Sequence, residues 1–126
     1  MSKGPAMYEL SIKSDFAASH YLPDYKGKCK KLHGHTWKVE AVFTGERLNK
    51  IGMVVDFAVI KKQFKAFLEK LDHVHLNHLP YFKKVNPTTE HLAKYIFNEF
   101  SKKCRPLKMK RVTVWESDTS SITYYE

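Results

Sequence analysis

The segment Cys29-Lys30-Lys31-Leu32-His33-Gly34-His35 decides how this chain is interpreted. Residues 32–44 alternate between apolar and polar side chains, which predicts a β-strand. Successive side chains of a strand point to opposite faces, so His33 and His35 project side by side. A third histidine closes the run Phe16-Ala-Ala-Ser-His20, toward which an earlier strand runs from residue 7. Both strands therefore deliver histidines to the same end of a hairpin-like pair.

The three histidines form a candidate metal site. Three neutral imidazoles leave a tetrahedral zinc ion one open position, as in catalytic rather than structural zinc sites. A lone histidine on a half-buried strand more often satisfies a local hydrogen bond, so the metal interpretation depends on all three histidines together. Cys29 lies four residues before His33, so its thiol could also be a fourth ligand that closes the site. The spacing permits either role.

Composition limits the class of protein without choosing a partner. The 126 residues, 43% of them hydrophobic, are enough for one domain over residues 1–126 with its own core. The net charge is 22 − 13 = +9, which usually suggests nucleic-acid binding. No zinc-finger spacing accompanies this charge, and a polyanionic small substrate or a solvated surface explains it equally well. Charge alone therefore does not decide the partner, and without a recognised binding motif no nucleic-acid partner is expected.

The cysteines and the apolar runs indicate the compartment. Cys29 and Cys104 give no disulfide framework. No apolar run approaches the roughly 18 residues of a membrane span. Residues 1–6 carry no signal-peptide core. We therefore expect a cytoplasmic protein without a membrane partner.

Two helices and two further strands complete the expected fold. Asp56 is a credible N-cap for a helix with apolar positions spaced by about 3.6 residues. The segment Asn86-Pro-Thr-Thr-Glu90 opens a second helix with Thr88 as its cap. Strands are expected over residues 110–116 and 121–125. This order predicts an α+β fold, a four-stranded antiparallel sheet with two helices packed on one face.

Six motifs, in this order along the chain, resemble those of one known family. They are Phe-Ala-Ala-Ser-His20, Cys29-Lys-Lys-Leu-His33-Gly-His35, Gly52-Met-Val-Val-Asp-Phe57, Leu71-Asp72-His73, Asn86-Pro-Thr-Thr-Glu90 and Trp115-Glu116-Ser. The family comprises the 6-pyruvoyl- and 6-carboxy-tetrahydropterin synthases, which have the tunnelling fold. The resemblance extends from Phe16 to Glu126 and implies a zinc-dependent lyase acting on a pterin.

Within this family the position of the cysteine helps to separate the activities. The 6-carboxy branch typically has three residues between its cysteine and the His-Gly-His motif, as here, whereas the pyruvoyl branch usually places its cysteine further upstream. The chain thus resembles the branch that converts 7,8-dihydroneopterin triphosphate to 6-carboxy-5,6,7,8-tetrahydropterin. That reaction releases acetaldehyde and triphosphate and serves queuosine (7-deazaguanine) biosynthesis.

Two alternatives remain open. The first is a 6-pyruvoyl-tetrahydropterin synthase or a related enzyme that cleaves the pterin side chain, with the same fold and metal ligands. The second is a zinc-stabilised nucleic-acid-binding module without catalysis. The lack of a finger pattern and the joint presence of Asp72, His73 and Glu116 oppose the second.

The resemblance also implies roles for the residues around the metal. His20, His33 and His35 would bind zinc, and the ion would act as a Lewis acid on the side-chain hydroxyls of the substrate. Cys29 would remove a proton from the side-chain carbon next to the ring, and the neighbouring lysines would favour its thiolate.

Further residues match the family's acid–base and pterin-binding positions. Asp72 would orient His73, which would shuttle a proton to or from a substrate hydroxyl. Glu116 would anchor the pterin by accepting hydrogen bonds from the ring N–H and the 2-amino group. Additional contacts to the ring or to a neighbouring subunit are assigned to Thr88, Thr89 and Glu90. The candidates for binding the triphosphate are Lys26, Lys28, Lys30 and Lys31.

The family joins its subunits into a barrel with a central tunnel and with active sites at subunit boundaries. The resemblance therefore implies a homo-oligomer, with a hexamer of two trimers favoured. An isolated four-stranded sheet with open edges would otherwise invite uncontrolled association.

Overall fold

The computed structural model describes residues 7–126; residues 1–6, where no signal-peptide core is expected, lie outside the described residues. The strands are β1 (Tyr8–His20), β2 (His33–Gly45), β3 (Val74–His75), β4 (Lys108–Ser117) and β5 (Ser120–Tyr125). The helices are α1 (Phe57–Leu68), α2 (Pro80–Lys84) and α3 (Thr89–Ser101), with short 3-10 helices at Lys28–Lys30 and Leu76–His78. No helix within residues 7–126 has the length and apolar character needed to cross a membrane.

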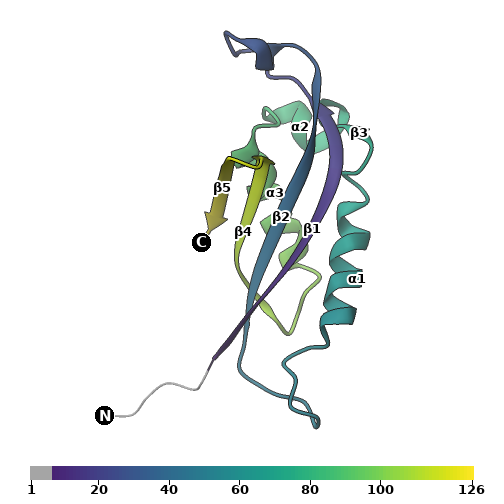
Figure 1. The fold of residues 1–126 in the computed structure, drawn as a ribbon, viewed down its shortest axis with the longest axis vertical. Coiled ribbons are helices and arrows are strands. Elements are labelled where there is room, and N and C mark those ends of the chain that lie inside the picture. The colour runs from purple at the N-terminus through teal and green to yellow at the C-terminus, as the bar shows by residue number, and fades with distance from the viewer. Residues whose placement is uncertain (1–6) are drawn as a thin grey trace, which may run out of the picture.

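The strands form one five-stranded sheet in the order β3-β1-β2-β4-β5 (Figure 1). The pairs β1–β2, β2–β4 and β4–β5 are antiparallel, which confirms the predicted α+β class and its four-stranded antiparallel core. The strand count was one short, because β3 adds a two-residue parallel pairing along Ala18 and Ser19 of β1. Two residues are too short to show the alternation by which a strand is recognised.

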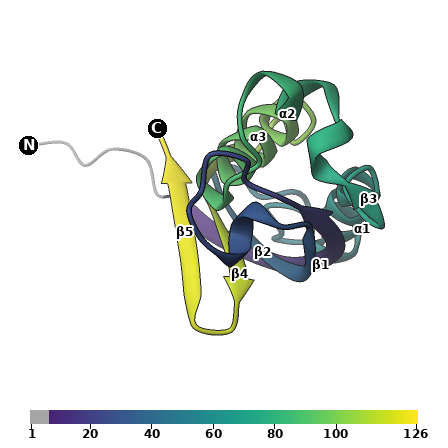
Figure 2. The ribbon, with the colours of Figure 1, turned by 90° about the horizontal axis from the view of Figure 1, so that it is seen from above.

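The helices lie together on one side of the sheet (Figure 2). Helix α1 packs against β1, and α3 packs against β4 and β5, so one hydrophobic core fills the space between the two layers. The short α2, which the sequence analysis did not predict, begins at Pro80, whose fixed φ suits the first turn of a helix. Phe100 of α3 illustrates the packing, since its ring contacts three other phenylalanine rings.

Both predicted helix caps are confirmed. The Asp56 carboxylate accepts from the Ala58 amide over 2.8 Å, and the Thr88 hydroxyl accepts from the His91 amide over 3.1 Å. These bonds satisfy amides that the first turn of a helix leaves without a partner. They fix the start of each helix relative to the sheet.

The first strand is longer than the sequence predicted. β1 does not end near Phe16 but continues to His20, where it pairs with His33 at the start of β2. The small residues at 17–19 gave a weak strand pattern, and the pairing with β2 maintains the strand there. The longest two strands thus end together at a pair of histidines.

Candidate metal centre

The three histidines come together at the end of the β1–β2 pair. His20 is opposite His33, and the next inward position of β1, Ala18, is opposite His35. Alternation turns all three imidazoles toward the helices, on the face that also buries Trp37. Their ligand atoms all lie within 4.8 Å of one another, and the group is the only cluster of its kind among residues 7–126.

The hydrogen bonds of two of these histidines leave their Nε2 atoms free to bind a cation. Nδ1 of His20 lies 2.8 Å from the Pro87 carbonyl, and Nδ1 of His33 lies 2.7 Å from the Lys31 carbonyl. A carbonyl oxygen can only accept, so each Nδ1 carries the proton and each neutral ring has a lone pair on Nε2. The two Nε2 atoms face each other at 3.1 Å, which is repulsive without a positive charge between them.

This geometry fits a zinc ion. Two ligands on tetrahedral zinc at the usual Zn–N length of about 2.05 Å stand about 3.3 Å apart, close to the separation of the two Nε2 atoms. Nε2 of His35 is buried and has no hydrogen-bond partner, as expected for an atom that awaits a ligand. The three residues therefore fit a metal with nitrogen ligands.

Protonation of a histidine would relieve the repulsion between the Nε2 atoms less readily than a bound metal ion would. Burial, the largest cause, lowers the pKa of both His20 and His35, and the neighbouring His33 lowers each further. The Pro87 carbonyl and Glu116 act in the opposite direction on His20 without reversing the shift. The buried site therefore favours neutral imidazoles, which are the form that binds metals.

Trp37 forms the base of the cluster, a role that the sequence analysis did not assign. Its ring meets those of His20 and His35 edge to face, with both centroid distances at 5.0 Å. The indole N–H donates to the Ala18 carbonyl over 3.3 Å, which satisfies its only donor. The position of Trp37 two residues after His35 was the signal for this role.

Glu116 lies beside the histidines. It continues the inward face of β4 after Val112 and Val114, and its Oε1 is 3.8 Å from Nε2 of His35. Its Oε2 accepts a hydrogen bond from the Thr89 hydroxyl over 3.1 Å. The carboxylate is thereby held at the edge of the candidate metal centre and is about one-third exposed.

The turn before α3 connects these groups. Pro87 supplies the carbonyl for His20, Thr88 caps the helix and Thr89 holds Glu116. The motif at residues 86–90 was singled out from the sequence, but the Pro87 contact was not anticipated. A backbone carbonyl carries no residue-specific signal, so only the folded structure shows that bond. Glu90 is exposed in the first turn of α3.

Asp72 and His73 form a second unit at the edge of β1. The His73 Nδ1 lies 2.9 Å from an Asp72 carboxylate oxygen, and the other carboxylate oxygen accepts from the Ala17 amide. That amide is the largest cause that holds the pKa of Asp72 below its usual range, followed by His73. The His73 side chain is 82% exposed, and its ring is not among those that contact the three clustered histidines.

His73 has a left-handed backbone conformation, with φ of 56°. Such conformations are uncommon outside glycine and are often found at functional sites. The His73 amide donates to the Ala17 carbonyl, so both backbone polar groups of Ala17 hold this turn. His73 and His35 line one shallow depression of about 540 Å³ beside β1 and β3.

Cys29 lies in the short 3-10 helix between β1 and β2, which extends beyond the helices at one end of the molecule (Figure 1). Its thiol is half-buried and is not part of the group of clustered ligand atoms within residues 7–126. The structure thus groups three histidines that could hold a metal ion, with the thiol outside that group. Cys104 is buried instead, and burial raises the pKa of its thiol.

Fold and site together define an α+β protein with a candidate mononuclear metal centre and an adjacent carboxylate at the end of a two-stranded ladder. Comparison with known proteins identifies the particular family. Residues 9–126 match the family described as 6-pyruvoyl tetrahydropterin synthase. The chain belongs to this family, whose members are pterin-processing enzymes.

Relatives with two different names are similar to this chain. A 6-carboxy-5,6,7,8-tetrahydropterin synthase from Synechocystis is 34% identical over 124 residues, which cover 94% of each chain. The human 6-pyruvoyl tetrahydrobiopterin synthase is 34% identical over 130 residues, which cover 92% of this chain and 90% of the relative. The solved 6-pyruvoyl tetrahydropterin synthase of Caenorhabditis elegans superposes with a TM-score of 0.86 at 26% identity, covering 97% of both chains.

Proposed function

We propose that this protein is a zinc-dependent lyase that converts 7,8-dihydroneopterin triphosphate and water to 6-carboxy-5,6,7,8-tetrahydropterin, acetaldehyde and triphosphate. The observation that carries the proposal is the cluster of three histidines, with facing Nε2 lone pairs, beside a carboxylate that Thr89 holds in place. The close spacing of Cys29 and His33 and the names of several relatives support the 6-carboxy product. The corresponding pathway would be queuosine biosynthesis.

Glu116 is suited to orient the pterin. Its carboxylate is partly exposed and accepts only one hydrogen bond from the described residues, so lone pairs remain for the ring N–H and the 2-amino group. Paired donors answered by a carboxylate give orientation as well as affinity. A pterin anchored there would lie beside His35, whose Nε2 is 3.8 Å from the Glu116 carboxylate. Thr88 and Glu90, at the start of α3, would add contacts around the ring.

Zinc bound by His20, His33 and His35 would supply Lewis-acid activation of the substrate's side-chain hydroxyls. Cys29 would take the proton from the side-chain carbon next to the ring. His73, held by Asp72, would exchange a proton with a side-chain hydroxyl. The reaction is redox-neutral: triphosphate leaves, the bond between the first and second side-chain carbons breaks, and water supplies the second carboxylate oxygen.

The exposed His73 favours a site completed by a neighbouring subunit. Its ring extends into solvent at the sheet edge, although Asp72 and Ala17 hold it in a defined orientation. Along this edge β1 is paired with β3 only at Ala18 and Ser19, so residues 8–17 of β1 have no strand partner on that side within residues 7–126. We propose a homo-oligomer, with a hexamer favoured, in which this edge meets another subunit.

The second candidate is the 6-pyruvoyl activity. The human relative with that name is as similar to this chain as the Synechocystis relative is. Both reactions would use the same metal ligands and pterin anchor. They would differ in whether triphosphate loss is followed by cleavage of the side chain.

The test is incubation of zinc-loaded protein with 7,8-dihydroneopterin triphosphate, followed by mass analysis of the pterin and assay of acetaldehyde. The proposal predicts 6-carboxytetrahydropterin and acetaldehyde in equal amounts. A 6-pyruvoyl product without acetaldehyde would establish the second candidate instead. Absence of turnover with one zinc bound per chain would overturn both. Glu116→Gln alters the proposed pterin anchor and should lower turnover. Glu99→Gln makes the same substitution at a surface position with no proposed role and should leave turnover unchanged.

A further inference from the structure

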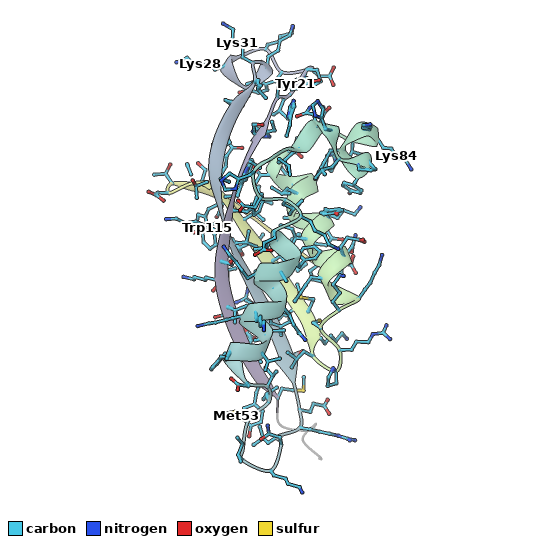
Figure 3. All side chains as sticks on the ribbon, turned by 90° about the vertical axis from the view of Figure 1, so that its right-hand side faces the viewer. Tyr21, Lys28, Lys31, Met53, Lys84 and Trp115 are labelled. Carbon is cyan, nitrogen blue, oxygen red and sulfur yellow. The ribbon has the colours of Figure 1, made fainter. Side chains whose placement is uncertain are left out.

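The segment between β1 and β2, residues 21–32, is called here the Cys29 loop. None of its side chains is buried. Figure 3 shows Lys28 and Lys31 at its outer end and Tyr21 closer to the helices. Segments with few buried apolar contacts open locally with little cost in free energy. The hydrogen bonds at the base of the loop therefore decide where Cys29 lies.

Asn77 makes two hydrogen bonds at this base, in addition to the exposed bond from Asn86 to the Asp24 carboxylate over 3.2 Å. Oδ1 of Asn77 accepts from the Tyr21 amide over 3.0 Å, and its Nδ2 donates to the Tyr21 carbonyl over 2.9 Å. The side-chain amide thus acts as one more residue of the β1 edge, just past the point where β3 stops pairing with Ser19. One amide supplies both the donor and the acceptor that Tyr21 needs.

The contact continues from Tyr21 to Cys29 through one residue. The amide of Leu22, next in the chain, donates to the Cys29 carbonyl over 2.8 Å. The far end of the loop is held by Nδ1 of His33, which donates to the Lys31 carbonyl over 2.7 Å. Asn77 therefore fixes Tyr21 at the start of the loop, and the adjacent Leu22 in turn holds the backbone of Cys29.

We propose that Asn77 is a positioning residue for Cys29, acting through Tyr21 and Leu22 without touching the substrate. This inference deepens the proposed function and rests on it for the role of the thiol. Without the Asn77 side-chain amide, the backbone N–H and carbonyl of Tyr21 that face residue 77 can bind only water. The Cys29 loop then opens more often, while the three metal ligands remain on their strands.

The experiment compares zinc-loaded wild type with Asn77→Ala and with Asn77→Asp, which keeps the size of the side chain but loses the donor. The matched control is Asn49→Ala. Asn49 also accepts two backbone amides, those of Ile51 and Met53, at the opposite end of the molecule, where Figure 3 labels Met53. Limited trypsin digestion with mass analysis measures cleavage after the loop lysines, which are Lys26, Lys28, Lys30 and Lys31. Cleavage after Lys50 reports on the Asn49 turn.

We expect Asn77→Ala, which loses both hydrogen bonds to Tyr21, to be cleaved in the Cys29 loop about tenfold faster than wild type. Asn77→Asp loses the donor and places a carboxylate oxygen against the Tyr21 carbonyl, so it should also be cleaved faster than wild type. Cleavage after Lys50 and the zinc content stay unchanged. The rate constant kcat falls by about tenfold and KM stays within about threefold, because the pterin anchor is intact. Asn49→Ala shows the reverse pattern, with faster cleavage after Lys50 and wild-type kcat.

Wild-type cleavage of the Cys29 loop in both Asn77 variants would overturn the inference. Faster cleavage everywhere would also overturn it, because Asn77 would then contribute only to general stability. If wild-type protein fails to convert the pterin, the proposed function fails, but the digestion still decides whether Asn77 holds the loop. The two failures are therefore distinguishable.

Discussion

Replacing Thr89 by valine tests whether Glu116 is held in place for a ligand. Valine keeps the branched shape of this buried side chain but removes the hydroxyl that donates to Oε2 of Glu116 over 3.1 Å. A hydrogen bond to a charged group contributes about 1.5–3 kcal/mol. The Glu116 side chain is 32% exposed, so water replaces part of that contribution, and we expect a loss of about 1.5 kcal/mol. This corresponds to a roughly tenfold larger dissociation constant for a pterin, which means weaker binding.

The assay is fluorescence titration of zinc-loaded protein with 7,8-dihydroneopterin. The control is Thr113→Val, since Thr113 is also buried on the sheet but its hydroxyl pairs with that of Thr123 over 2.7 Å. By alternation Thr113 lies on the opposite face of β4 from Glu116. Unchanged affinity in Thr89→Val would refute the reasoning. An equal loss in both variants would attribute the effect to general weakening of the sheet.

Three further predictions test the thiol, the histidines and the core. Cys29→Ala should keep its zinc and lose about 10²–10⁴-fold in turnover, as measured by metal analysis and product formation; loss of the metal together with the thiol would make Cys29 a ligand. Because burial lowers the pKa of His20 and His35 below the ordinary 6.5, unfolded chains bind more protons than the native metal-free protein. The contribution of these two histidines to the free energy of unfolding is therefore fully present above about pH 6.5 and is lost as the pH falls through their lowered pKa values. The urea midpoint of chelator-treated protein should drop on acidification to about pH 5.5, and a constant midpoint would contradict this. Phe100→Ala should lower the free energy of unfolding by about 3–5 kcal/mol in the same assay, because three phenylalanine rings surround it, and a loss below about 1 kcal/mol would contradict the packing.

Much of the fold followed from local patterns. The alternation along residues 32–44 placed His33, His35 and Trp37 on one face, and the structure has them there. The caps at Asp56 and Thr88 could be predicted because a cap depends on residues two or three positions away. Each of these features is decided within one element or its first turn.

The connections that complete the site could not be predicted in this way. The bond between His20 and the Pro87 carbonyl joins residues 67 positions apart, and the bond between Asn77 and Tyr21 spans 56. Bonds from a side chain to a distant backbone group have no periodicity and depend on how the layers pack. The left-handed turn at His73 escaped prediction for a related reason, since its amide is bound by the carbonyl of the distant Ala17 in β1.

The candidate metal centre and the hydrophobic core depend on the same strand register. Phe16 of β1 is opposite Trp37 of β2 and their rings stack at 6.3 Å, four residues before His20 meets His33. A slip of one residue would turn Phe16 and His20 to the other face together, exposing a large ring and separating the histidines. The free energy that buries Phe16 and Trp37 therefore also holds His20 opposite His33 before any metal binds. This is why weak strand formers at residues 17–19 can still deliver His20 to the site.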